Sequence, residues 1–126
     1  MLMPTTEWVA PKEFPDLRSA EEIAIDLETR DPDLKTKGSG SIVGNGEVVG
    51  IAVAVDGYKN YFPIAHGEGP NMDRDKVLRW FKDICESPAT KIFHNAMYDV
   101  CWLKAYNIKI NGYIVDTMVM LSLIHI

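Results

Sequence analysis

The chain has 126 residues, of which 47% are hydrophobic and 25% charged, a composition typical of one globular domain. Its 13 basic and 18 acidic residues leave a net charge of −5, which argues against binding nucleic acid mainly through a basic surface. Acidic residues do suit an enzyme that meets phosphate groups through divalent cations. No apolar run approaches the roughly 18 residues of a membrane span, and the N-terminus lacks the basic start of a signal peptide, so we expect a cytoplasmic protein.

The N-terminal third begins with a segment that shows no regular pattern. Residues 1–20 carry three prolines and no sustained hydrophobic period, which predicts an extended lead-in. Residues 22–28 are β-branched and apolar before they end in acids, which predicts a buried strand whose end reaches an edge of the sheet. Residues 29–45 are rich in Gly and Asp-Pro signals, so we expect a loop there.

Strands and helices alternate through the rest of the chain. Residues 48–55 and 58–64 flank an Asp-Gly turn, which predicts a hairpin. Helices are predicted from Asp73 to near Pro88, from Asn95 to about Tyr106 and from Asp116 onward, with short strands at residues 91–93 and 113–115. Three antiparallel strands followed by alternating helices and strands predict an α/β fold, with a mixed five-stranded sheet and helices on its faces.

Two carboxylates stand side by side on the first strand. Asp26 and Glu28 are two residues apart and project from one face, while Ile23, Ile25 and Leu27 project from the other. Adjacent negative charges repel each other unless a cation lies between them. The alternative is a strand that ends at Asp26 with solvated acids.

A second polar group follows the short strand at residues 91–93. Asn95 and Asp99 lie one helical turn apart, and the alternative here is a helix that Asn95 caps, with Asp99 near its positive end. A strand that follows a βα crossover usually lies parallel to its neighbour, so these side chains would reach the same sheet edge as Asp26 and Glu28. Three converging carboxylates would suit Mg²⁺ or Mn²⁺ rather than zinc.

At these motifs the sequence resembles a known family. Residues 25–29, Ile-Asp-Leu-Glu-Thr, resemble the first motif of the 3′-5′ exonucleases that use four acidic residues, and residues 95–99 resemble the second. Residues 61–66 and 114–118 are similar to stretches of the proofreading domain of family A, polymerase I type, DNA polymerases. The resemblance spans residues 21–120 and, with so short a lead-in, is most like a bacteriophage polymerase.

The resemblance implies a ribonuclease H-like fold and two-metal hydrolysis at the 3′ end of single-stranded DNA, releasing nucleoside 5′-monophosphates. The implied catalytic and metal-binding residues are Asp26, Glu28 and Asp99, which would hold two divalent ions, Mg²⁺ or Mn²⁺. The implied substrate-binding residues are Leu27, Thr29, Asn95 and Tyr98. We expect His66 and His94 to support the site or its loops rather than to bind metal, because their spacing resembles no metal motif.

The third motif of the family, a Tyr or His followed by the fourth metal-binding Asp, is not found. Tyr113 precedes Asp116 by three positions in a strand context, so we interpret Asp116 as a helix cap and expect no fourth acidic ligand in the chain. Residues 21–120 would then be an incomplete domain with little or no activity. Residues 121–126 match the translation of a transposase adapter end, CTG TCT CTT ATA CAC ATC, and we interpret them as an adapter-derived artefact.

The sequence is also compatible with two other functions. One is an RNA-directed 3′-5′ exoribonuclease of the ribonuclease D type, which would differ in how it treats the 2′-hydroxyl. The other is a non-catalytic nucleic-acid-binding or scaffold domain of a polymerase, which the retained acids disfavour. The expected partners are the 3′ end of single-stranded DNA and the polymerase domain of a parent chain, with no membrane, in the host cytoplasm if the source is viral.

Overall fold

The computed structural model describes residues 9–124, and the side chains of residues 9–120. Its strands are β1 (Glu22–Arg30), β2 (Glu47–Val55), β3 (Tyr58–Pro63), β4 (Thr90–Phe93) and β5 (Ile114–Asp116). Its helices are α1 (Leu34–Lys37), α2 (Gly40–Val43), α3 (Arg74–Glu86), α4 (Ala96–Ala105) and α5 (Thr117–Ile124). Within this described part, no helix is long and apolar enough to cross a membrane.

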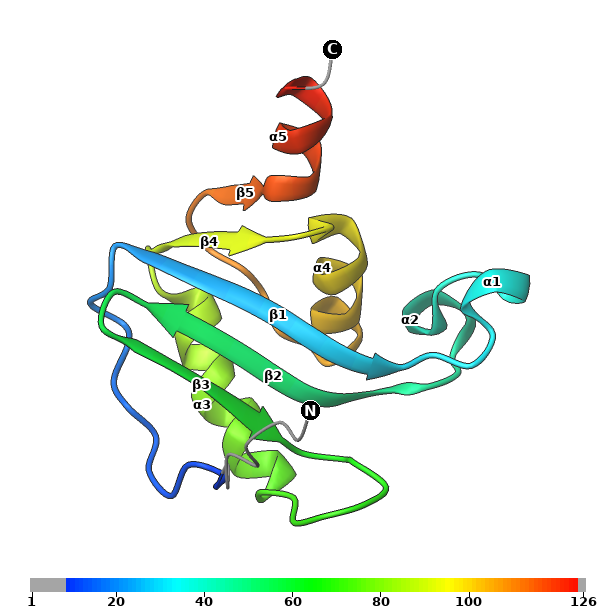
Figure 1. Cartoon of the computed structure of the whole chain (residues 1–126), viewed down its shortest axis with the longest axis horizontal. Coiled ribbons are helices and arrows are strands. Elements are labelled where there is room, and N and C mark those ends of the chain that lie inside the picture. The colour runs from blue at the N-terminus through cyan, green and yellow to red at the C-terminus, as the bar shows by residue number, and fades with distance from the viewer. Residues whose placement is uncertain (1–8, 125–126) are drawn as a thin grey trace, which may run out of the picture.

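The five strands form one mixed sheet in the order β3-β2-β1-β4-β5 (Figure 1). The β1–β2 and β2–β3 pairs are antiparallel, whereas β1–β4 and β4–β5 are parallel. The predicted mixed five-stranded sheet is therefore confirmed. Ala24 pairs with Ile92 in the parallel β1–β4 ladder, so the carboxyl ends of these two strands point to the same edge of the sheet.

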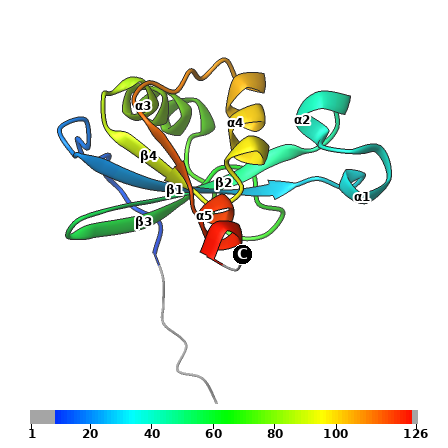
Figure 2. The same cartoon turned by 90° about the horizontal axis from the view of Figure 1, so that it is seen from above.

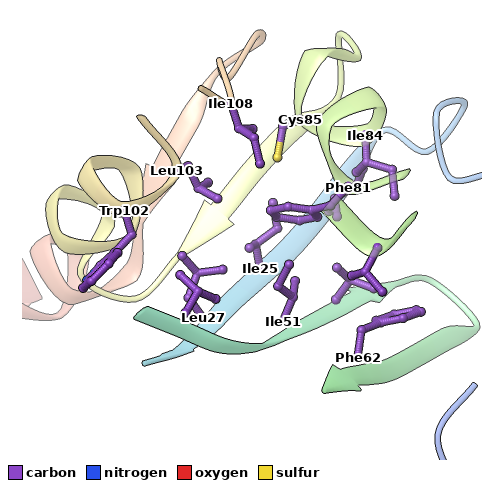
Figure 3. Close-up of a cluster of buried hydrophobic side chains, with 14 of the residues drawn as sticks. Ile25, Leu27, Ile51, Phe62, Phe81, Ile84, Cys85, Trp102, Leu103 and Ile108 are labelled. Carbon is purple, nitrogen blue, oxygen red and sulfur yellow. The ribbon is translucent and has the colours of Figure 1, made fainter. Parts of the chain in front are cut away.

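One face of the sheet carries the core. Ile23, Ile25 and Leu27 are only 0%, 3% and 7% exposed. Figure 3 shows Ile25 and Leu27 on the side of the sheet that α3 and α4 cover (Figures 2 and 3). The buried residues of helix α3 recur at helical spacing, as its sequence predicts. Asp73 caps the start of this helix, where its carboxylate accepts a hydrogen bond from the Lys76 backbone amide at 3.1 Å. The alternation along β1 thus separates the core from the acids.

The opposite face, here called the outer face, is covered mainly by small side chains. It holds a cavity of about 680 Å³ over the middle of the sheet. Ala24, Ala52 and Ala54 lie along its lining, with Asp26 and Tyr61 beside them. Figure 2 shows α5 on the side of the sheet away from α3 and α4.

The two irregular segments are more ordered than their sequences indicate. Part of the expected lead-in packs on α3. The ring centroids of Phe14 and Trp80 lie 5.5 Å apart, and the Trp80 Nε1–H donates to the Pro15 carbonyl at 2.7 Å. The segment predicted as a loop contains the single-turn helices α1 and α2, held where the Gly40 amide donates to the Asp31 carboxylate at 3.0 Å. Residues 1–8 of the lead-in and the side chains of residues 121–126 lie outside the described part.

Candidate active site

The end of β1 presents two exposed carboxylates. Asp26 and Glu28 alternate with the buried Ile25 and Leu27, so both lie on the outer face. The parallel ladder with β4 ends at Ala24, and β1 continues beyond it toward α4. At Asp26 and Glu28, the edge of β1 that faces away from β2 is therefore not paired with β4, and its backbone groups can bond to other residues.

Helix α4 brings a third carboxylate to this place. Asp99 is 4% exposed, and its Oδ2 accepts a hydrogen bond from the Leu27 amide at 3.4 Å. Leu27 lies between Asp26 and Glu28 in the sequence, so the α4 carboxylate meets β1 between the two acids. The β1–β4 pairing makes this meeting possible, because α4 begins where β4 ends.

The electrostatic setting of Asp99 is unusual for a carboxylate. Burial raises the pKa of Asp99 to about 7, the Leu27 amide opposes this rise, and the negative charges of Asp26 and Asp116 add to it. A carboxyl group in such surroundings loses its proton at a cost unless a positive charge arrives. The nearby acids therefore favour a cation at this end of β1.

The donors present fit a divalent ion such as Mg²⁺ in their chemistry. Carboxylate oxygens are the ligands that this ion prefers, and Asp99 is a buried carboxylate whose hydrogen bond in the structure is a single long one. Between residues 9 and 120, no three His, Cys, Asp or Glu side chains lie close enough together to hold a metal ion as they stand. Asp26 and Glu28 are exposed, so their side chains are free to turn toward Asp99.

Two of the residues expected to touch substrate are hydrogen-bonded to each other. The Thr29 and Tyr98 hydroxyls lie 2.8 Å apart, and the Tyr98 hydroxyl donates to Asp31 Oδ2 at 2.7 Å. This network joins the end of β1 to the first turn of α4 and to the α1–α2 segment. Leu27 is buried, so its side chain is not available to a ligand.

The alternative interpretation, in which the Asn95 side chain caps α4, is wrong. Asn95 has a left-handed backbone with φ of 72°, and its side chain makes no capping hydrogen bond. The Asp116 carboxylate replaces it, accepting from the Asn95 and Ala96 amides at 3.0 Å each. Asp116 also accepts from the Met118 amide at 3.0 Å, which confirms its interpretation as the cap of the next helix.

Asp116 is held as an anion by these contacts. Burial acts to raise its pKa, but hydrogen bonds from the backbone amides at the starts of α4 and α5 lower the pKa overall. Its role at α4 joins residues 21 positions apart, so no local sequence signal could have found it.

The two histidines near the site contact other side chains. His94 Nδ1 lies 2.9 Å from the Thr117 hydroxyl, and His66 Nε2 shares a short hydrogen bond with the Tyr61 hydroxyl. The sequence alone gives Tyr61 no role, although Tyr61 belongs to the residues that carry the family resemblance. It lies on the outer face, in the cavity that Asp26 also lines.

Comparison with known proteins agrees with this arrangement. A family model described as a 3′-5′ exonuclease matches residues 4–126. The chain is 39% identical over 82 residues to a DNA-directed DNA polymerase of Pseudomonas phage M6, covering 62% of this chain and 12% of the relative. It is 36% identical over 109 residues to DNA polymerase I of Pseudomonas aeruginosa, covering 81% of this chain and 11% of the relative.

The fold agrees with solved structures as well. Brucella melitensis NrnC superposes with a TM-score of 0.54 at 20% identity, over 86% of this chain and 46% of that one. NrnC with bound Mg²⁺ gives the same TM-score of 0.54, over 86% of this chain and 47% of that one. At this identity the likeness supports the ribonuclease H-like fold. On the family match and the polymerase relatives, the chain belongs to the 3′-5′ exonuclease domain family of the polymerase A type DNA polymerases.

Proposed function

We propose that this chain removes nucleotides from the 3′ end of single-stranded DNA, as the proofreading part of a DNA polymerase. The observation that carries the proposal is the hydrogen bond from the Leu27 amide to Asp99, which holds the α4 carboxylate against the β1 backbone between Asp26 and Glu28. Both curated relatives are DNA polymerases, and the chain spans about an eighth or less of their lengths. We take residues 21–120 as the exonuclease domain, acting beside a polymerase domain in the cytoplasm.

Three carboxylates would hold two divalent ions, Mg²⁺ or Mn²⁺. Asp26 and Glu28 would bind one ion from the outer face, and Asp26 and Asp99 the other. When bound, such ions lower the pKa of a water molecule and stabilise the charge on the leaving 3′ oxygen. The buried setting of Asp99 supports this assignment, since a cation offsets both the burial and the repulsion from nearby acids that raise its pKa.

The residues around the acids would hold the terminal nucleotide. The Leu27 backbone and the Thr29 side chain border the acids on β1, and Asn95 and Tyr98 border Asp99 on α4. The Thr29–Tyr98 hydrogen bond would hold these residues in place, because it joins β1 to α4 at the site. A rigid arrangement favours one orientation of the scissile phosphate.

The chain by itself would be a weak enzyme. Asp116 is not free to serve as a fourth acidic ligand, because its oxygens accept hydrogen bonds from the starts of α4 and α5. Three carboxylates therefore have to hold both ions. We expect slow, Mg²⁺-dependent release that needs the chain in excess over substrate.

The test is single-turnover digestion of a 5′-labelled single-stranded DNA with the 126-residue chain in excess and Mg²⁺ present. We expect stepwise shortening from the 3′ end with release of nucleoside 5′-monophosphates. Asp26→Asn keeps the side-chain size but removes the charge, so it should reduce the rate by at least about 100-fold. Asp56→Asn, in the β2–β3 turn far from the site, is the matched control and should cleave at the wild-type rate.

The outcomes separate the possible functions. Equal cleavage by wild type and Asp26→Asn would overturn the assignment of the acids. Faster cleavage of an RNA strand of the same sequence would favour the exoribonuclease alternative. Tight binding of the labelled DNA with no shortening at any Mg²⁺ concentration would favour a non-catalytic binding domain.

A further inference from the structure

Tyr61 shares the outer face of the sheet with the acids of β1. Asp26 pairs with Ala52 across the β1–β2 ladder, and Ala52 pairs with Tyr61 across the β2–β3 ladder. Residues directly opposite one another in antiparallel strands project to the same face. Asp26, Ala52 and Tyr61 therefore form one row across three strands, with the smallest side chain in the middle.

The phenol of Tyr61 leans along this face onto Gly50. A Cβ added at Gly50 would overlap the Tyr61 hydroxyl and the adjacent ring atoms, so the hydroxyl occupies the place of a Gly50 side chain. Gly50 is paired directly with Glu28. Side chains directly opposite in antiparallel strands have Cβ atoms about 5 Å apart, so the Tyr61 hydroxyl lies within reach of the Glu28 carboxylate.

A second group orients this hydroxyl from the other side. His66 Nε2 shares a short hydrogen bond with the Tyr61 hydroxyl, and the two rings meet edge to face with centroids 5.7 Å apart. When His66 donates this hydrogen bond, the Tyr61 hydroxyl can in turn donate toward Glu28, whose negative charge acts on Tyr61. The tautomer of His66 thus decides whether Tyr61 donates to Glu28.

The loop that carries His66 is itself held in place. The His66 amide donates to Asn71 Oδ1 at 2.8 Å, and Asn71 Nδ2 donates to the His66 carbonyl at 2.9 Å. The Ile64 amide donates to the Val49 carbonyl at 2.9 Å, which ties the loop to β2 one residue before Gly50. These bonds restrict the position of the His66 ring, as a supporting residue requires.

The electrostatics agree with a neutral tyrosine facing an acid. Burial raises the pKa of Tyr61, and the negative charge of Glu28 raises it further. The phenol therefore keeps its proton at neutral pH and remains a hydrogen-bond donor.

We propose that Tyr61 and His66 form a positioning pair, in which the Tyr61 hydroxyl, oriented by His66, directs the Glu28 carboxylate toward its divalent cation. The inference rests on the proposed function and adds two residues and a glycine to the machinery of that site. Groups of this kind orient metal-binding side chains without touching the metal, and their loss typically weakens metal binding by about 10–100-fold. Gly50 is required because any larger side chain would displace the phenol.

The test measures Mn²⁺ binding to the complete chain by electron paramagnetic resonance, which requires no catalytic activity. Tyr61→Phe removes the hydroxyl and keeps the ring over Gly50, so we expect about tenfold weaker Mn²⁺ binding. Tyr58→Phe is the matched control, because Tyr58 belongs to the same strand, β3, and packs against the core from the other face. We expect this variant to bind Mn²⁺ as the wild type does.

A double-mutant cycle separates positioning from a general structural role. If Tyr61 acts through Glu28, adding Tyr61→Phe to Glu28→Gln should change the Mn²⁺ affinity by less than about twofold. His66→Gln retains an amide donor near the position of Nε2 and should preserve most of the affinity. His66→Leu removes this donor and should weaken binding as Tyr61→Phe does, so these variants keep the test decisive even where one of them folds poorly.

Each outcome bears on a different claim. Wild-type Mn²⁺ affinity in Tyr61→Phe, with or without a lower melting temperature, would overturn the positioning pair and leave the proposed function intact. Additive losses in the cycle with Glu28→Gln would also overturn it. Failure of the wild-type chain to bind Mn²⁺ at all would overturn the metal site of the proposed function, and the positioning of Glu28 with it.

Discussion

Asp99 is the residue at which the fold and the proposed chemistry oppose each other most directly. Its carboxylate is 4% exposed, accepts one long hydrogen bond and lies near other negative charges. In the absence of metal this arrangement favours the protonated form. A metal-binding site is expected to lower the stability of the fold when no cation is bound, because its carboxylates repel each other. In this chain we expect Asp99 to cause most of that destabilisation.

This setting predicts a pH-dependent stability for the metal-free chain. The pKa of Asp99 is about 7 in the fold, raised from an ordinary 3.8, so the folded state binds the proton more tightly than the unfolded state. The protonated Asp99 side chain therefore stabilises the fold fully below pH 4. As the pH rises from 4 to 7 this stabilisation is lost, and the free energy of unfolding falls by about 1 kcal/mol per pH unit. Asp99→Asn removes the charge, and this part of the pH dependence should disappear.

The measurement is urea unfolding of both proteins at pH 4 and pH 8 with a chelator present. The difference between the two proteins isolates Asp99 from the other carboxyl groups, which titrate alike in both. Asp99→Asn should be the more stable protein at pH 8 and lose its advantage at pH 4. Parallel pH profiles would show that Asp99 is not destabilised in the empty site.

At the scale of elements, the start of α4 is the junction on which the site depends. Its first amides bond to Asp116 from the end of β5, so the position of Asp99 depends on a strand that follows α4 in the sequence. The same carboxylate accepts from the Met118 amide in α5. One side chain therefore connects two helix starts and the edge of the sheet.

Replacing Asp116 should destabilise the fold more than replacing Asn95, the residue directly before α4. Asp116→Ala leaves the Asn95 and Ala96 amides without their acceptor and should lower the free energy of unfolding by about 1–2 kcal/mol. Asn95→Gly removes a side chain with no capping bond and suits the φ of 72°, so it should change stability by less than about 0.5 kcal/mol. Chemical denaturation of both variants checks this order, and the reverse order would restore Asn95 as the cap.

At the scale of the whole molecule, apolar side chains are exposed at the β5 end of the sheet. Tyr113 is 83% exposed, Ile114 45%, Met118 48%, Val119 55% and Met120 51%. They lie on β5, the segment before it and the start of α5. Adjacent exposed apolar residues of this number favour association with another surface.

We therefore expect the isolated chain to self-associate as its concentration rises. Met118→Lys places a charge among these residues and should shift the association to higher concentration. Ile42→Lys is the matched control, because Ile42 is 77% exposed but lies on α2, away from β5. Sedimentation velocity across a dilution series checks this expectation. A monomer at all concentrations, or an equal effect of both substitutions, would contradict it.

Much of this protein could be predicted from its sequence because the relevant signals are local. Periods of two and about 3.6 residues identify the strands and helices, and the Asp-Gly turn identifies the β2–β3 hairpin. The alternation along β1 separates Asp26 and Glu28 from the core. The crossover rule places β4 parallel to β1, so that Asp99 reaches the same edge. Each of these inferences needs only neighbouring residues or the order of the elements.

Only the tertiary structure decided the contacts between residues that are distant in sequence, and those of residues whose type gives no signal of their role. Lys91 is fully buried, and its ammonium donates to the Ser87 and Asn111 carbonyls rather than to an acid. Asp116 caps a helix that precedes it, and the Tyr61 phenol fills the space that Gly50 leaves open. Hydrophobic periodicity specifies which face of an element is buried, but not which polar group from elsewhere satisfies an open amide or carbonyl. Those pairings depend on where the packed elements finally lie, and only the assembled fold contains that information.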